Sequence, residues 1–417
     1  MDLFHGEPMF SAVRQMMHAL AEQEIRPIAA RHDREESMPW ELMKKARGFG
    51  LSQTAMLDAR RLMGDGGAAA GADGADGADG AKGAAREKKA GRGARAAVVG
   101  AEELAWGCAG IALALGGSGL AAAPVARIGT EEQQQVFRGA LKGEDEGGRI
   151  KVAAMALSEP QTGSDISSLA TSARRDGNHW VLRGHKQWIT NGQSASIYVV
   201  WAQTDASLGR GGVRGFLIER GTPGLVPGRK ETKLGIRASE TAQVHFEDCR
   251  VHQDLMLGAN RTSEGLGDTK KMLDATRPVV GAQAVGIARA AFEHLLERVQ
   301  AGSLRGAPLA GHQHVAFALS EMEMEIQASR LLVHRAAWMA DHGLDNVAFA
   351  SMAKAHAART AQAVTARAMA LLGEEGLEPG HPVEKWYRDA KIYDIFEGTG
   401  QIQRRIIARQ LTGVNAV

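Results

Sequence analysis

The strongest candidate for a reactive group is Glu397, near the end of the chain. It lies in KIYDIFEGTGQIQRRIIARQ, residues 391–410, directly before the Gly-Thr-Gly triplet 398–400. Glycine lets a backbone leave helical geometry, and helical apolar spacing resumes after the triplet. The pattern predicts a break in the helical region at this carboxylate. On its own, the pattern favours a helix-terminal glutamate placed near the positive end of the next helix.

Other polar clusters predict less chemistry. LGGSGLAAAP, residues 115–124, has the outline of a dinucleotide loop, but no β-branched strand precedes it and no acidic residue follows about 20 positions later. We expect a tight turn between helices there. His312 and His314 are two apart, so on a helix they point to different sides, and we predict no metal site.

Two motifs in the middle of the chain combine strands with polar turns. MALSEPQTGSDISSLATSA, residues 155–173, runs from a strand into a turn that carries hydroxyl groups at Ser158, Thr162 and Ser164. GHKQWITNG, residues 184–192, is a strand in which the side chains of Trp188 and Thr190 lie on the same face. Either motif alone is compatible with a core tryptophan beside ordinary turn residues.

The elements that must position these residues form three regions. Helical spacing covers 9–63, returns from about 98 to 141, and dominates 269–412; short Val-, Ile- and aromatic-rich runs fill about 150–257. The strands follow one another without helices between them, which favours antiparallel pairing. We therefore predict an α+β fold with an N-terminal helical domain (1–149), a middle antiparallel β domain (150–262) and a C-terminal four-helix bundle (263–417).

Residues 64–97 differ from the rest of the N-terminal region. Gly/Ala/Asp repeats are followed there by a basic run, with no aromatic residue and little apolar surface beyond alanine. Such a segment cannot bury enough surface to offset its ordering entropy. We predict a flexible insertion within the first domain.

Composition excludes several classes of function. The 417 residues carry a formal net charge of +2, which is no footprint for nucleic-acid binding. Cys108 and Cys249 are far apart, so we expect no disulfide scaffold and a cytoplasmic location. No run approaches 18 uncharged apolar residues, and the N-terminus lacks a secretory pattern, so no membrane span is expected.

Taken together, the motifs resemble the acyl-CoA dehydrogenase flavoprotein family. The stretches EELAWGCAGIALAL, LSEPQTGSD, KQWITNG, DATRPVVGAQAVGIA and PVEKWYRDAKIYDIFEGTGQIQR occur in the family's order between about residues 98 and 412. The resemblance is to the medium- and short-chain members. It implies FAD-dependent α,β-dehydrogenation of an acyl-CoA to a trans-2-enoyl-CoA, with electrons passed to an electron-transfer flavoprotein. An acyl-CoA oxidase, or a mainly structural partner subunit, is the alternative.

The resemblance also implies roles for individual residues. Glu397 is the base, because the position that holds the base in some relatives, before Arg277, is Thr276 here. Residues that match FAD contacts are Leu157, Ser158, Gly163, Ser164, Trp188, Ile189, Thr190, Arg305, Gln313 and Thr399. Residues that match acyl-CoA contacts are Ser164, Asp274, Arg277 and Gly398.

Three departures from the family pattern bear on assembly and substrate. Relatives bind a neighbouring subunit's FAD diphosphate through Arg-x-x-Phe-Gly and through a glutamine with a Gly-Gly pair. Here Gly302 replaces that arginine, Ala370 the glutamine and Glu374 the second glycine. We expect either a homotetramer or a heterotetramer with a related subunit. Gly116 stands where medium-chain relatives have a glutamate at the floor of the acyl pocket, which favours a longer or bulkier acyl group.

Overall fold

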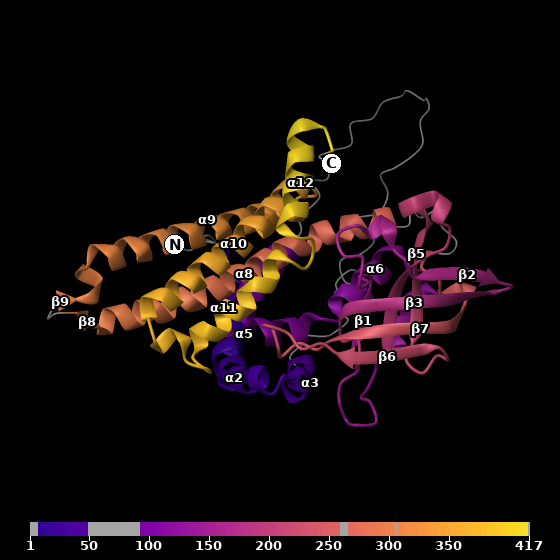
Figure 1. The fold of residues 1–417 in the computed structure, drawn as a ribbon, viewed down its shortest axis with the longest axis horizontal. Helices are drawn as coiled ribbons and strands as arrows, with labels where there is room; N and C mark the ends of the chain where they lie inside the picture. Colours follow the sequence, from indigo (N-terminus) through magenta and orange to yellow (C-terminus); the bar gives the residue numbers. More distant parts are fainter. Residues whose placement is uncertain (1–6, 49–91, 259–265, 305–306, 416–417) are drawn as a thin grey trace.

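Helices from both ends of the sequence pack together beside one β domain (Figure 1). The computed structural model describes residues 7–48, 92–258, 266–304 and 307–415. The helices of the N-terminal region are α1 (Pro8–Leu20), the π-helical turn η1 (Ala21–Ile25), α2 (Arg26–Arg34), α3 (Trp40–Gly48), α5 (Gly93–Gly116), α6 (Gly119–Ile128) and α7 (Glu131–Ala140). Those of the C-terminal region are α8 (Leu266–Ala301), α9 (Gln313–Asp341), α10 (Val347–Leu372), α11 (Pro382–Ala390) and α12 (Gly400–Thr412).

The middle domain is a seven-stranded sheet in the order β1-β4-β2-β3-β7-β6, with β5 paired to β4. Its strands are β1 (Ala153–Ala156), β2 (Ser172–Asp176), β3 (His179–Thr190), β4 (Ile197–Gln203), β5 (Val213–Glu219), β6 (Leu225–Lys230) and β7 (Thr241–His252). Two-residue strands β8 (Ser303–Leu304) and β9 (Ala307–Pro308) pair separately between α8 and α9. The predicted architecture of helices, β domain and helix bundle is confirmed.

Strand direction departs from the sequence-based prediction at one side of the sheet. β1 pairs with β4 in parallel, and β2 makes one parallel contact with β4. The other pairs are antiparallel. The hairpin of β2 and β3 lies between β1 and β4 in the sequence, so the chain has a connection long enough to return in the same direction. Strand periodicity carries no information about that return.

The N-terminal helices divide their apolar faces between two cores. Helix α5 shares one core with α8, α9 and α10, whereas α6 and α7 share another with strands β1, β4 and β5. The opposite face of the sheet forms a third core. The predicted N-terminal domain therefore joins the bundle to the sheet.

Helix α5 is the one described helix that is long and apolar enough to cross a membrane by length and composition. The sequence-based expectation overlooked it because two glutamates interrupt its apolar run. In the fold, 89% of its most apolar window is buried. Its composition is thus that of a central core helix.

The end of the predicted insertion is ordered helix. Most of residues 64–97 lie outside the described residues, but α5 begins at Gly93. Asp341 accepts hydrogen bonds from the backbone N–H groups of Ala94 (2.8 Å) and Arg95 (3.2 Å) and pairs with the Arg95 guanidinium. A carboxylate at a helix N-terminus satisfies free N–H groups and the helix dipole, which explains why the helix starts within an alanine-rich stretch.

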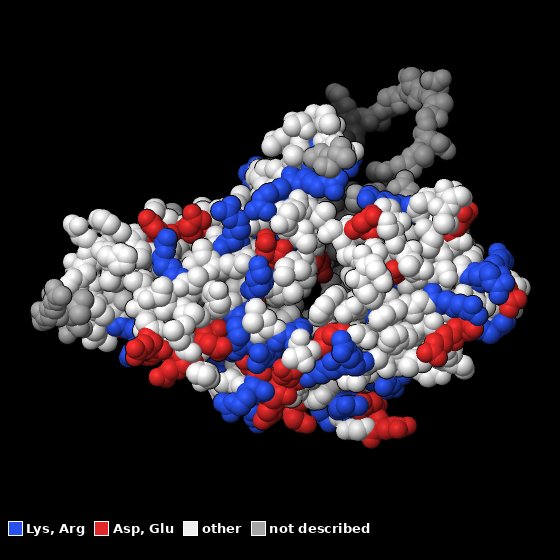
Figure 2. Space-filling view, viewed as in Figure 1, with Lys and Arg blue, Asp and Glu red and all other residues white. Residues whose placement is uncertain are grey.

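Charged side chains of both signs are interspersed over the face in Figure 2. Acidic and basic groups alternate along its lower edge, where the N-terminal helices meet the β domain. This face is a mixed surface rather than one of a single sign.

Close packing of α5 on α8 gives a stability prediction. A Cβ on Gly286 would lie 2.2 Å from the carbonyl oxygen of Glu102, so Gly286→Ala forces the helices apart. We expect the free energy of unfolding to fall by about 1–3 kcal/mol. Gly139→Ala on α7 is the control, because its Cβ would meet no atom within 4 Å. Denaturant titration showing equal effects for both would contradict the packing argument.

Candidate active site

The predicted break around Glu397 is present. Helical geometry stops after residue 394, and α12 begins at Gly400 with Thr399 as its N-cap, whose hydroxyl accepts from the Ile402 N–H at 3.3 Å. Glu397 has a φ of 55° and Gly398 one of 91°. Left-handed geometry is uncommon for glutamate, and such residues concentrate at functional sites.

Two buried side chains hold the backbone of this turn. Lys354 of α10 donates to the Gly398 carbonyl oxygen at 2.7 Å. Gln403 of α12 donates to the same oxygen at 2.9 Å and to the Glu397 carbonyl at 3.2 Å. Both side chains belong to fully buried residues. Burial lowers the pKa of Lys354 to about 8, against the opposing effect of nearby Asp394 and Glu397.

The Glu397 carboxylate lies between one hydroxyl and two cations. Thr276 donates to Glu397 Oε2 at 2.8 Å. Burial raises the pKa of Glu397 above its ordinary value, although the Thr276 hydrogen bond and the charges of Arg277 and Lys354 act in the opposite direction. The fold thus brings the C-terminal glutamate against Thr276 of α8, a residue 121 positions earlier in the chain.

The Glu397 backbone amide is not used by the hydrogen bonds of the turn. Among the described residues, no acceptor takes the hydrogen of this N–H. It lies on the same residue as the carboxylate, so a carbonyl oxygen bound there would place its neighbouring carbon close to the carboxylate. This is the arrangement that proton abstraction next to a carbonyl requires.

A bulge in β3 turns Trp188 away from the core. Lys186 pairs with Val244 and Ile189 with Ala242, so two residues of β3 face one residue of β7. Trp188 has a φ of 63° and the residue is 55% exposed, whereas Ile189 is buried in the sheet core. Bulges re-aim side chains near functional sites. An exposed tryptophan held by the backbone is a flat apolar surface for a planar ligand.

A buried ion pair fixes the polar turn next to this strand. Lys186 donates to Glu159 Oε1 at 2.8 Å and to the Leu157 carbonyl at 2.9 Å. The Glu159 carboxylate also accepts from the backbone N–H groups of Ala170 and Thr171. Lys186 is fully buried and Glu159 is 4% exposed. The two middle motifs, separate in sequence, are therefore one structural unit.

The glycine-rich turn between α5 and α6 packs against the same strand. A Cβ on Gly117 would lie 3.1 Å from Thr190 Cγ2 and from Asn191 Nδ2. The Ser118 hydroxyl oxygen accepts from the Ala153 N–H at 2.8 Å. The structure places a tight turn between two helices, as predicted. Gly116 beside it is exposed, with open space at its Cβ position.

The predicted site residues differ in how the structure places them. Leu157, Ser158 and Thr190 are partly buried, and Gly163 and Ser164 are exposed. The Ile189 side chain lies in the core, so only its backbone can face a cofactor. Gln313 is exposed at the start of α9, and Arg277 is 3% exposed. Arg305 and the Asp274 side chain lie outside the described part of the chain.

Sequence reasoning missed the residues that hold these two turns. Lys354, Gln403, Lys186 and Glu159 were not singled out. The available signal was a lysine inside the alanine-rich run ASMAKAHAA, where a buried charge must have a partner.

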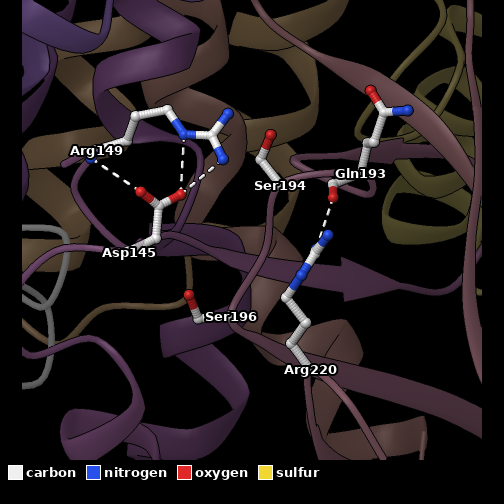
Figure 3. A pocket seen from close by; sticks show the side chains of 6 residues that line it. All are labelled: Asp145, Arg149, Gln193, Ser194, Ser196 and Arg220. Carbon is white, nitrogen blue, oxygen red and sulfur yellow. Dashed lines mark hydrogen bonds and ion pairs between the residues drawn. The ribbon is translucent and has the colours of Figure 1, made fainter. Parts of the chain in front are cut away.

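A separate polar hollow contains none of the predicted site residues (Figure 3). Asp145 and Arg149 pair across it, and Arg220 donates to the Gln193 carbonyl oxygen at 2.7 Å and to that of Ala195 at 3.2 Å. These bonds fix the loop that follows Asn191. The Arg220 side chain at this hollow therefore stabilises the loop after β3, outside the candidate site.

Family models match most of the chain. They are described as the N-terminal domain (residues 9–59 and 79–144), the middle domain (154–249) and the C-terminal domain (263–412) of acyl-CoA dehydrogenase. Residues 60–78, which overlap the first part of the predicted insertion (64–97), lie between the two matched N-terminal segments.

Comparison with individual proteins finds similar sequences and structures in the same family. A short-chain specific acyl-CoA dehydrogenase, mitochondrial, of Bos taurus is 39% identical over 403 residues, covering 96% of this chain and 89% of that protein. The butyryl-CoA dehydrogenase structure from Megasphaera elsdenii is 32% identical with a TM-score of 0.82, covering 97% and 98% of the two chains. A chain in a structure described as the electron transferring flavoprotein of Acidaminococcus fermentans is 30% identical with a TM-score of 0.82, covering 99% and 100%.

The raised pKa of Glu397 gives a prediction for stability against pH. A carboxyl whose folded pKa exceeds its ordinary value of 4.5 contributes stability that is fully present below pH 4.5 and is lost as the pH rises through the folded pKa. Glu397→Gln removes this loss. We expect the variant to be more stable than the wild type at pH 7–8, with the difference shrinking towards pH 4. Thermal melts over this range test it; a variant that loses stability at neutral pH would contradict it.

Proposed function

The chain belongs to the acyl-CoA dehydrogenase family of FAD-dependent oxidoreductases acting on CH–CH donors, and from this premise we propose that it oxidises the Cα–Cβ bond of an acyl-CoA thioester to a trans-2-enoyl-CoA. The observation that carries this proposal is the turn at Glu397. It presents a carboxylate with a raised pKa and a free amide on one residue, clamped by Lys354 and Gln403.

In this reaction Glu397 removes the α-proton. A thioester α-proton is far too weakly acidic to leave unaided, so the developing negative charge on the carbonyl oxygen must be stabilised. The Glu397 N–H supplies a donor, and one such donor is typically worth about 2.7–4 kcal/mol. The raised carboxyl pKa makes the group a stronger proton acceptor than an exposed glutamate. Bound FAD supplies the acceptor for the β-hydride.

The residues present fit the flavin ring. Trp188 offers an exposed aromatic face, and the Leu157–Ser158 backbone is tied beside it through Lys186 and through the bond from the Gln187 N–H to the Ser158 carbonyl oxygen at 2.9 Å. Thr190 continues the same strand. Gly163 and Ser164, at the exposed end of the adjacent turn, would contact the pyrimidine edge and pyrophosphate. Gly398 and Arg277 lie beside Glu397, where they would meet the acyl-CoA.

The proposed electron acceptor is an electron-transfer flavoprotein. A chain in a structure described by that name matches nearly the whole length of this protein. The alternative is an oxidase, which would pass the electrons to oxygen and release peroxide. Both cysteines are buried and unpaired, which agrees with a reducing compartment such as the cytoplasm.

Two observations point to different acyl groups. The Bos taurus relative is named short-chain specific, whereas Gly116 leaves open space where a glutamate would narrow the pocket. We favour a short-chain acyl-CoA as the reference substrate, because 39% identity over 96% of the chain outweighs the single difference at Gly116. The open space at Gly116 would extend the accepted range towards bulkier groups.

An apolar stripe on α9 supports association of several subunits. Phe317, Met324, Leu331 and Trp338 recur every seven residues, and their exposed fractions are 62%, 63%, 53% and 37%. Large apolar side chains aligned at this spacing form one helix face suited to packing against another subunit.

The departures from the family pattern favour two kinds of subunit. A Cβ on Gly302 would lie 2.5 Å from Leu309 Cδ1, so any larger residue at this position requires the Leu309 side chain to move. Ala370 and Gly373 line an apolar hollow of about 400 Å³, with Met369 and Tyr387. Glu374 beside it is exposed and would repel a diphosphate. The proposed assembly is a heterotetramer in which a related subunit supplies those contacts; a homotetramer is the alternative.

Replacement of the base tests the reaction. Glu397→Gln should retain bound FAD and lose about 10²–10⁴-fold in kcat, because a positioned general base contributes that much. The assay is a panel of acyl-CoA thioesters of increasing chain length with a dye acceptor, run with a peroxide assay. Near-wild-type turnover would show that the base lies elsewhere, and no turnover of any thioester by the wild type would overturn the proposal.

FAD content tests the assembly. Each lost charged hydrogen bond to the diphosphate should cost about 1.5–3 kcal/mol, or roughly tenfold or more in affinity. The chain purified alone should therefore contain less than one FAD per subunit, with the content rising when a related subunit is co-expressed. Absorbance and mass measurements that show one tightly held FAD on every chain of a homotetramer would exclude the heterotetramer.

A further inference from the structure

The segment between β6 and β7, residues 231–240, links the two halves of the candidate site. It leaves the sheet and packs against helices from both ends of the chain. Ile236 and Ala238 lie in the core of the bundle rather than in that of the sheet. Gly110 of α5 packs against them, since a Cβ there would lie 3.2 Å from Ala238 Cβ.

The middle of this segment, residues 234–236, is fastened to α11. The Asp389 side chain, which is fully buried, accepts from the Ile236 N–H at 2.5 Å and pairs with Lys385. Ile236 has a φ of 48°, an outlier for a β-branched residue. The backbones touch at Gly235, where a Cβ would lie 2.4 Å from the Arg388 carbonyl oxygen.

Arg388 strengthens the same junction. It donates to the Leu234 carbonyl oxygen at 2.9 Å and pairs with Asp33 of α2 at 2.7 Å. Helix α11 is therefore held by the β domain and by an N-terminal helix at once. Asp389 precedes Glu397 by only eight residues, with one short helical turn between them.

The C-terminal end of the segment, at Glu240, is fastened to the strand that carries Trp188. Thr241 pairs with Thr190. The Glu240 carbonyl oxygen accepts from the Asn191 N–H at 3.1 Å, and its carboxylate accepts from the N–H groups of Gln193 and Ser194, both at 2.9 Å. Residues 236–240 thus run from the helix that leads into the base to the flavin-flanking strand.

We infer that residues 231–240 form a strut that sets the position of the Glu397 turn relative to the flavin-flanking strand, with Asp389 as the positioning residue that fastens it. This inference rests on the proposed function for its catalytic consequence. Its structural consequence is that contacts with the β domain hold the Glu397 turn in place, and this consequence does not depend on the proposed function. The strained backbone at Ile236 is kept because Asp389 and the core around it leave no alternative.

The test compares Asp389→Ala with Asp389→Asn in the full-length protein. The alanine variant loses the acceptor for the Ile236 N–H, whereas asparagine keeps an oxygen there. We expect Asp389→Ala to accelerate hydrogen–deuterium exchange in residues 391–399 and to lower kcat by about 10²-fold, the cost of a misplacement of about 1 Å. FAD content and KM should stay within twofold, and asparagine should restore most of kcat.

Asp341→Ala is the matched control, because Asp341 is also a buried carboxylate that accepts a backbone N–H from another region and pairs with a cation. It should lower the melting temperature without accelerating exchange in 391–399. If Asp341→Ala accelerated exchange in residues 391–399 as much as Asp389→Ala, or if Asp389→Ala left that exchange unchanged, the strut proposal would be wrong.

A second variant covers the case in which Asp389→Ala does not fold. Gly235→Ala keeps every hydrogen bond donor and acceptor but pushes the segment off α11, and the same exchange and kcat changes are expected. Exchange measurements do not depend on turnover. If the wild type oxidises no acyl-CoA, the proposed function fails while the exchange result still decides the strut.

Discussion

The site depends on one constraint: a backbone that breaks out of helical geometry inside a packed bundle must still have its polar groups satisfied. At Glu397 and Gly398 the chain turns through left-handed geometry, and two carbonyl oxygens lose their helical partners. Lys354 and Gln403 replace those partners from two other helices. Without them the turn would leave unpaired carbonyls in the bundle, a cost of about 1–3 kcal/mol each. The Glu397 carboxylate can lie beside Thr276 of α8 because buried side chains satisfy the backbone of its turn.

A buried lysine also binds irregular backbone in the β domain. Lys186 and Glu159 are buried, and a buried ion pair contributes little net stability, because desolvation of both charges offsets their attraction. Their effect is on position. Together they bind one carbonyl and two N–H groups of a turn that has no strand partner of its own. In both halves of the site a buried lysine fixes irregular backbone, and the reactive or ligand-facing groups are its neighbours.

These two halves belong to different cores, so their relative position has to be set by contacts between the cores. Helices α5 and α6 provide one connection, through the close approach of Gly117 to the end of β3. The segment from Glu231 to Glu240 provides the other. This arrangement explains why an N-terminal region with little chemistry of its own is packed between a bundle and a sheet.

The sequence by itself determined the order of helices and strands, the break before α12 and the residues at both turns. Each of these follows from local signals: apolar periodicity, glycine pairs, and polar clusters after strands. The residues alone favoured a helix-terminal glutamate at Glu397, and only the resemblance of several motifs to one family predicted a base there.

Only the tertiary structure decided which residues hold those groups in place. Lys354 lies 44 positions from the carbonyl it binds, and Asp389 lies 153 positions from the Ile236 amide. The parallel pairing of β1 with β4, and the division of the N-terminal helices between two cores, depend equally on distant contacts. The bulge that exposes Trp188 and buries Ile189 arises because β3 has two residues between Lys186 and Ile189 where β7 has one between Val244 and Ala242. Local periodicity describes which face of an element is apolar, whereas these contacts depend on which other element that face meets.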